Sequence, residues 1–281
     1  MAAYRYVVAD VFTDTALEGN QLAVFTDARG LDDELMQALA LEIGFSETVF
    51  VFPAGEEADA RIRIFTPRSE LPFAGHPTLG TAFVLGAPLQ LGVIRLATKN
   101  GVVPVVLERD DSGRIVFGRM SQPVPVVEPF EDTGGLFRAL GVEGSELPVE
   151  VYDNGARHVF VALRSQEEVA AMRPDGPALS AYRATGVSCF AGEGLRWKLR
   201  MFFAGPNVGE DPATGSAAGP LACHLARHGR INWHDEIVIT QGVEMGRPST
   251  LHARAEGGDG RIDAVEVGGA AVLVARGEFR L

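Results

Sequence analysis

The chain has 281 residues, of which 46% are hydrophobic and 22% are charged, and its formal net charge is −12 at pH 7. This length fits two domains of ordinary size, each able to bury a core. The negative charge argues against a nucleic-acid partner, which needs a basic face, and no apolar run is long enough to span a bilayer. Because the first residues enter a strand pattern directly, without a signal-peptide pattern, we expect a cytoplasmic location.

The first half of the sequence is rich in predicted strands. Apolar spacing predicts a helix from Leu31 to Ile43 that stops at Gly44. A second helix is expected from about His76 to Leu85, with Pro77 in its first turn. Alternation and β-branched residues predict strands at 4–12, 21–26, 47–53, 60–66, 92–98, 102–108 and 114–120, with a hairpin at Asn100-Gly101.

Residues 121–129 contain three prolines and are expected to connect two lobes. We therefore predict an N-terminal lobe at 1–122 and a C-terminal lobe at 123–281, with a last strand, about 270–281, that can pack back on the first lobe. The second half is expected to hold helical segments at 133–140, 167–172, 177–185 and 216–228, and strands at 148–153, 158–163, 187–191, 197–203, 236–240, 249–255, 262–267 and 271–280.

Two segments of the chain match each other at an offset of 140 residues. Glu70 matches Glu210 and Gly75 matches Gly215, and each segment opens a mostly small, apolar helix. A spacing of half the chain indicates an internal duplication, with one glycine-rich helix start in each lobe. If the lobes face each other, the two positive helix ends form a site for an anion, most simply a carboxylate.

Several residues around these helix starts can carry chemistry, although each also has an ordinary structural interpretation. Glu47 is a lone carboxylate among apolar residues at a strand start; its local pattern favours a solvated or capped side chain, but an apolar setting would make it a proton carrier near neutral pH. His76 is expected to be a neutral hydrogen-bonding imidazole or a cap. Asp211 and Ser216 can be helix caps, and Gly75 and Gly215 turn glycines. Because such residues occur at the start of both matched helices, a functional site is favoured over these structural interpretations.

No other motif in the sequence competes with this pair. The chain has no phosphate-loop lysine, no GxGxxG after a strand and no GxSxG elbow. His224 and His228 are four residues apart on one predicted helix, but no carboxylate accompanies them in a metalloprotease pattern, so we predict a surface pair and no metal. Cys189 and Cys223 are expected to be buried, inert thiols.

The order of these motifs resembles the phenazine-biosynthesis PhzF isomerase family over essentially the whole chain. The matching segments are Gly19-Asn20, Ser46-Glu47-Thr48, Phe65-Thr66-Pro67, Glu70 to Thr78, and Asp211 to Ala217. The resemblance implies an α+β, diaminopimelate-epimerase-like fold: two pseudo-symmetric lobes, each a mostly antiparallel sheet wrapped around a central helix. One departure is Gln21, where the family commonly has proline.

The resemblance also implies an activity and its residues. The better-understood members of the family isomerise trans-2,3-dihydro-3-hydroxyanthranilate without metal or coenzyme and are typically homodimers. It implies Glu47 as the general base, with His76 and Asp211 also catalytic. Asn20, Gly75, Gly215 and Ser216 are then expected to bind the substrate. Two alternatives remain open at this point: an isomerase or epimerase that acts on a different small carboxylate, and a non-catalytic binding protein on the same scaffold.

Overall fold

The computed structural model describes residues 2–182, 185–203 and 209–281. Within them the chain divides into two compact units, Met1–Ser121 together with Gly268–Leu281, and Gln122–Val267. We call these unit 1 and unit 2. The last strand, Ala271–Arg280, pairs antiparallel with the first, Ala3–Val11, so both ends of the chain belong to unit 1. No helix in the described part is long and apolar enough to cross a bilayer.

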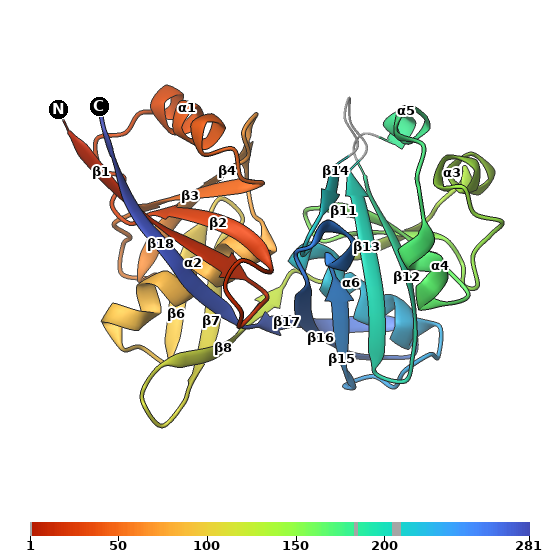
Figure 1. The fold of residues 1–281 in the computed structure, drawn as a ribbon. Coiled ribbons are helices and arrows are strands. Elements are labelled where there is room, and N and C mark those ends of the chain that lie inside the picture. The colour runs from red at the N-terminus through yellow and green to blue at the C-terminus, as the bar shows by residue number, and fades with distance from the viewer. Residues whose placement is uncertain (1, 183–184, 204–208) are drawn as a thin grey trace. The chain divides into compact units, whose positions relative to one another are not determined.

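Unit 1 is a mixed, mostly antiparallel sheet around one central helix, α2, which packs against β1, β2, β3, β6, β7 and β18 (Figure 1). The strands pair in the order β7-β6-β4-β3-β2-β1-β18; β2 with β3 and β4 with β6 are parallel. Its elements are β1 Ala3–Val11, β2 Asn20–Phe25, α1 Asp33–Ile43, β3 Glu47–Phe52, β4 Ala60–Phe65, β5 Glu70–Leu71, α2 Gly75–Leu89, β6 Val93–Thr98, β7 Gly101–Arg109, β8 Ile115–Gln122 and β18 Ala271–Arg280.

Unit 2 repeats this design around the helix α6, which packs against β15 and β16 (Figure 1). Its strands pair in the order β9-β10-β11-β12-β13-β15-β16; β11 with β12 and β13 with β15 are parallel. Its elements are β9 Val126–Pro129, α3 Thr133–Leu140, β10 Glu150–Asp153, β11 Arg157–Ala162, α4 Gln166–Ala171, α5 Gly176–Leu179, η1 Ser180–Tyr182, β12 Gly186–Glu193, β13 Arg196–Phe203, β14 Gly209–Asp211, α6 Gly215–Arg227, β15 Glu236–Gln241, η2 Val243–Met245, β16 Ser249–Gly258 and β17 Arg261–Gly269.

The two units are built on the same strand-pairing pattern, which supports the duplication inferred from the sequence. The parallel pairs β2–β3 and β11–β12 correspond, as do β4–β6 and β13–β15. In each unit a short strand, β5 or β14, pairs antiparallel just before the central helix. The α+β, two-lobed fold expected from the sequence is confirmed.

The matched glutamates make the same ion pair in both units. In unit 1, Glu70 lies opposite Phe65 and binds Arg63 through two hydrogen bonds of 2.8 and 2.6 Å. In unit 2, Glu210 lies opposite Phe202 and binds Arg200 through two bonds of 2.8 Å. Each guanidinium also stacks on the ring of that phenylalanine. These paired contacts hold the short strand that leads into each central helix.

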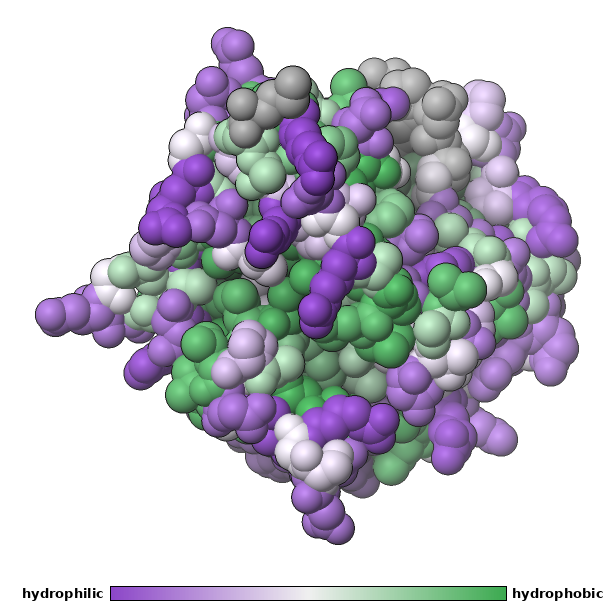
Figure 2. Space-filling view, turned by 60° about the vertical axis from the view of Figure 1, so that its left-hand side comes forward, coloured by the Kyte–Doolittle hydropathy of each residue, from purple (hydrophilic) through white to green (hydrophobic). Residues whose placement is uncertain are grey.

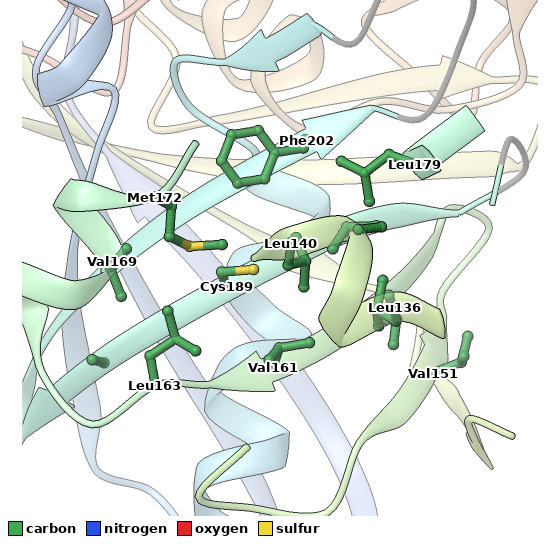
Figure 3. Close-up of a cluster of buried hydrophobic side chains, with 14 residues drawn as sticks. Leu136, Leu140, Val151, Val161, Leu163, Val169, Met172, Leu179, Cys189 and Phe202 are labelled. Carbon is green, nitrogen blue, oxygen red and sulfur yellow. The ribbon is translucent and has the colours of Figure 1, made fainter. Parts of the chain in front are cut away.

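The outer face of each sheet is covered by the remaining helices. In unit 2, apolar side chains of α3, α4 and α5 form a core with the side chains of β10 to β13 that face these helices (Figure 3). In unit 1, α1 covers Phe25, Phe50 and Phe65 in the same way. Helix α1 ends at Ile43, as predicted, before Gly44 with its φ of 70°, but it begins at Asp33 rather than Leu31, because Asp32 is its N-cap residue.

Four expectations need correction. The predicted connection 121–129 includes a strand, β9, which pairs with β10. The short strands β5 and β14 were not expected, and α2 continues past Leu85 to Leu89. The helix predicted at 177–185 is only α5 followed by the short η1 turn, and residues 183–184 lie outside the described residues.

Candidate active site

Unit 1 places Glu47 against His76. Glu47 is the first residue of β3 and lies opposite Leu22 of β2 in the parallel pair, while His76 is the second residue of α2. The Oε2 atom of Glu47 lies 3.4 Å from Nε2 of His76, and the two side chains are 14% and 6% exposed. Glu47 is therefore a sheltered carboxylate, and the solvated alternative considered from the sequence is wrong. Two residues that the sequence singled out are thus neighbours in unit 1.

Burial keeps the His76 imidazole uncharged. It lowers the pKa of His76 to about 3, and a hydrogen bond to the Gln21 backbone raises that pKa by a smaller amount. His76 is not the N-cap residue of its helix, since that position belongs to Ala74. At neutral pH the pair is a neutral imidazole beside a carboxyl group, which is suited to passing a proton rather than to a fixed ion pair.

Asn20 orients the other side of the His76 ring. It is fully buried at the start of β2, and its Oδ1 accepts a hydrogen bond of 3.1 Å from Ser46 Oγ. This leaves Nδ2 facing His76 Nδ1 at 3.4 Å. The preceding Gly19 has a φ of +66°, and an added Cβ there would lie 2.4 Å from the Val11 carbonyl oxygen. The Gly-Asn turn therefore needs glycine in order to place Asn20 at the ring.

Unit 2 places Asp211 in a buried polar network just before α6. Asp211 is 7% exposed, and its Oδ2 accepts a hydrogen bond of 2.5 Å from Thr214 Oγ1. Gln241, at the end of β15, donates to the Asp211 carbonyl at 2.8 Å and to Thr214 Oγ1 at 2.9 Å, and it accepts from the Thr214 amide at 3.0 Å. The N-cap residue of α6 is Thr214. Sequence reasoning missed Thr214 and Gln241.

Ser216 is the second residue of α6, and side chains outside the helix hold it on two sides. Its Oγ lies 2.9 Å from Nε2 of His158, a buried residue of β11. Its carbonyl accepts a hydrogen bond of 3.0 Å from Asn154 Nδ2. That carbonyl cannot receive the usual helical bond, because the residue four positions on is Pro220, which has no N–H. Sequence reasoning missed His158 and Asn154, which lie in an ordinary strand and a tight turn.

The two central helices differ from the others at their N-termini. In helices α1, α3, α4 and α5 the side chain of the N-cap residue, Asp or Ser, accepts a hydrogen bond from a backbone N–H of the first turn. The N-cap residues of α2 and α6, Ala74 and Thr214, make no such bond. The first turns of α2 and α6 begin at Gly75 and Gly215, so these amides are suited to receiving an anion.

The other reactive side chains noted in the sequence, two cysteines and a pair of histidines, are held in surroundings that serve the fold. Burial raises the pKa of the Cys189 thiol and raises that of Cys223 to about 12, so neither is a base near neutral pH.

His224 and His228 meet Glu150, which supplies a carboxylate that the sequence pattern did not reveal. His224 is fully buried, so the predicted surface pair is wrong. Arg227 Nη1 lies 2.8 Å from the same oxygen, Glu150 Oε2, so this group is an ion-pair cluster.

A family model described as phenazine biosynthesis-like protein (PhzC-PhzF) matches residues 9–277. This chain belongs to that family. A relative named trans-2,3-dihydro-3-hydroxyanthranilate isomerase, from Pseudomonas aeruginosa, is 51% identical over 278 residues, which cover 99% of this chain and all of the relative. A second relative of that name, from Pseudomonas chlororaphis, is 48% identical over the same length. With relatives of this identity named as isomerases, the chain is an enzyme of the isomerase class.

Solved structures agree with the fold. The PhzF-family phenazine biosynthesis protein of Bacillus anthracis superposes with a TM-score of 0.87 over all of both chains, at 26% identity. A hydroxyproline epimerase of Agrobacterium vitis has a TM-score of 0.67 at 13% identity, covering 99% of this chain and 91% of that one. The second likeness concerns the fold alone and places the chain among the two-lobed epimerase-like architectures.

Proposed function

We propose that this isomerase moves a proton within trans-2,3-dihydro-3-hydroxyanthranilate, the compound that names its relatives at 51 and 48% identity. Glu47 takes a proton from carbon and returns it at another position of the conjugated system. The observation that carries this proposal is the 3.4 Å contact between the sheltered Glu47 carboxylate and the neutral imidazole of His76. A positioned base of this kind contributes on the order of 10²–10⁴-fold to the rate.

The remaining site residues are assigned by their surroundings. His76 and Asp211 share protons with the substrate's polar groups, and each is held by buried neighbours, Asn20 and Thr214 respectively. Gly75 and Gly215 are the first residues of α2 and α6, whose N-cap side chains make no capping bond, so the backbone amides there can bind an anion. In this proposal those amides and the Ser216 hydroxyl bind the substrate carboxylate, and Asn20 also contacts the substrate.

The proposal is tested by steady-state kinetics with trans-2,3-dihydro-3-hydroxyanthranilate on purified protein. We expect turnover by the wild type, and a loss of at least about 10²-fold in kcat for Glu47→Gln with folding unchanged. Glu42→Gln, at an exposed position of α1, is the matched control and should turn over normally. If the wild type is inactive on this compound but active on a different small carboxylate, the substrate assignment is wrong.

We propose that the reaction needs neither metal nor coenzyme, because carboxyl and imidazole groups already supply the proton-transfer chemistry. Activity should therefore survive dialysis against a chelator, followed by desalting. A loss of activity that added divalent metal restores would contradict this.

We propose a homodimer, as the family resemblance implies. Figure 2 shows a face on which apolar side chains gather within a polar surround. In unit 1, Val93 of β6 and Val106 of β7 lie opposite each other and are 45% and 48% exposed, an apolar pair suited to an interface. Light scattering should give twice the chain mass, and Val106→Lys should lower it, whereas Leu41→Lys on α1 should not. A monomeric wild type would refute the dimer.

A further inference from the structure

The structure assigns a positioning role to His158: we infer that its Nε2–H donates to Ser216 Oγ and so leaves the Ser216 hydroxyl proton free to bind the substrate carboxylate. This inference rests on the proposed function of Ser216. It concerns a residue outside the motifs that the sequence singles out. The two atoms lie 2.9 Å apart.

The surroundings of the ring select its tautomer. His158 is 2% exposed, and its Nδ1 has no hydrogen-bond partner among the described residues. A proton on Nδ1 would be a buried N–H without an acceptor, which folded proteins tolerate less readily than an unfilled acceptor. The proton is therefore on Nε2, where Ser216 Oγ accepts it.

The ring is neutral, so it has only one N–H to give. Burial lowers the pKa of His158 to about 4, and the nearby Asp153 carboxylate raises it by a smaller amount. Because Nε2 donates, the Ser216 hydroxyl cannot spend its own proton on the ring. That proton is then directed at another acceptor, and a carboxylate at the start of α6 is one.

The two units differ at this point, which explains why His158 is needed. In unit 1 the strand after the parallel crossover, β3, begins with Glu47, whose side chain faces the second residue of α2. In unit 2 the corresponding strand, β12, begins with Gly186, which pairs with His158. A Cβ at Gly186 would lie 2.7 Å from His158 Nδ1. The absence of a side chain at Gly186 thus makes room for a ring that reaches the second residue of α6.

The Ser216 backbone is fixed independently of its hydroxyl. Asn154 donates to the carbonyl of Ser216, and Gln122 donates at 2.9 Å to the carbonyl of Gly215. Loss of the ring should therefore free the hydroxyl to rotate without moving the start of the helix. This predicts an effect on substrate affinity rather than on the chemical step.

The first test reads the tautomer directly. ¹⁵N NMR of the wild-type protein, with His158 assigned by comparison with His158→Gln, should report a protonated Nε2 and an unprotonated Nδ1 at pH 7. The opposite tautomer would overturn the inference. This measurement needs no substrate, so it stands even if the proposed reaction is wrong.

The second test couples His158 to Ser216. We expect His158→Leu to raise the KM for trans-2,3-dihydro-3-hydroxyanthranilate, and the Kd for the unreactive carboxylate anthranilate, by about tenfold, as loss of one hydrogen bond to a charged group predicts. His158→Gln, whose amide can donate from the same place, should restore most of the affinity, and His252→Gln is the control. In a Ser216→Ala background, His158→Leu should have no further effect.

An equal loss of affinity in the Ser216→Ala background, or a His158→Gln variant that is folded but as weak as His158→Leu, would overturn the inference. Failure of the proposed function would look different. Glu47→Gln would keep its turnover, while the coupling between His158 and Ser216 in anthranilate binding would persist.

Discussion

His76 Nε2 lies 3.4 Å from Glu47 Oε2, and burial keeps that histidine neutral. A neutral imidazole cannot neutralise the carboxylate, but it can exchange a proton with it. Removing the imidazole should therefore slow the chemical step more than it weakens binding. We expect His76→Leu to lower kcat by about 10²-fold with a smaller change in KM. Stopped-flow single-turnover rates check this, and an unchanged rate would exclude His76 from the proton path.

The carboxylate of Asp211 is held by the Thr214 hydroxyl at 2.5 Å. Asp211→Asn keeps an oxygen that can accept this bond but removes the charge and the proton acceptor. We expect turnover to fall by about 10²-fold while the melting temperature changes little. Thr214→Val is the companion variant, because it leaves the charge and removes the positioning bond, together with the bond that the same hydroxyl accepts from Gln241, so its activity should be intermediate. Wild-type kcat in Asp211→Asn would remove Asp211 from the catalytic set.

Much of the molecule could be predicted from the sequence because its strands and helices have clear apolar periods. Helix α3 has the predicted bounds. Glu70 and Glu210, which match each other in the sequence, make equivalent ion pairs in the two units. The local pattern around Glu47 favoured a solvated residue, because its neighbour His76 is far away in sequence. Nothing in the sequence around His158 indicated a role, because the proposed role depends on the space that Gly186 leaves in the next strand. Such long-range pairings are invisible to local propensity.

Gln241 ties β15 to the turn before α6, and its removal should destabilise the protein. Its side chain is fully buried and satisfies the Thr214 amide and the Asp211 carbonyl. Gln241→Leu leaves both backbone groups buried without these partners, which should cost about 3 kcal/mol in the free energy of unfolding. Urea denaturation measures this. Gln37→Leu, which loses one partly buried bond to the Thr66 carbonyl, should cost less.

The Glu150 cluster should make stability depend on acid pH. Burial raises the pKa of Glu150, but hydrogen bonds from His224 and His228 and the charge of Arg227 outweigh it and lower the pKa from 4.5 to about 2. A depressed folded-state pKa adds stability that is complete above about pH 4.5 and is lost as the pH falls toward 2. Glu150→Gln should therefore be less stable at pH 7, by about 2 kcal/mol, and should lose less stability between pH 4.5 and 2. Parallel pH profiles for the two proteins would contradict this account.

The most direct test of Glu47 as the proton carrier is turnover of trans-2,3-dihydro-3-hydroxyanthranilate in heavy water, followed by ¹H NMR. The wild type should give product with solvent deuterium at the carbon that gains the proton, because the proton that Glu47 removes exchanges with solvent deuterium before the carboxyl group delivers it. Glu47→Gln should leave the substrate unconverted while still binding anthranilate. Conversion by folded Glu47→Gln at the wild-type rate would contradict the central claim.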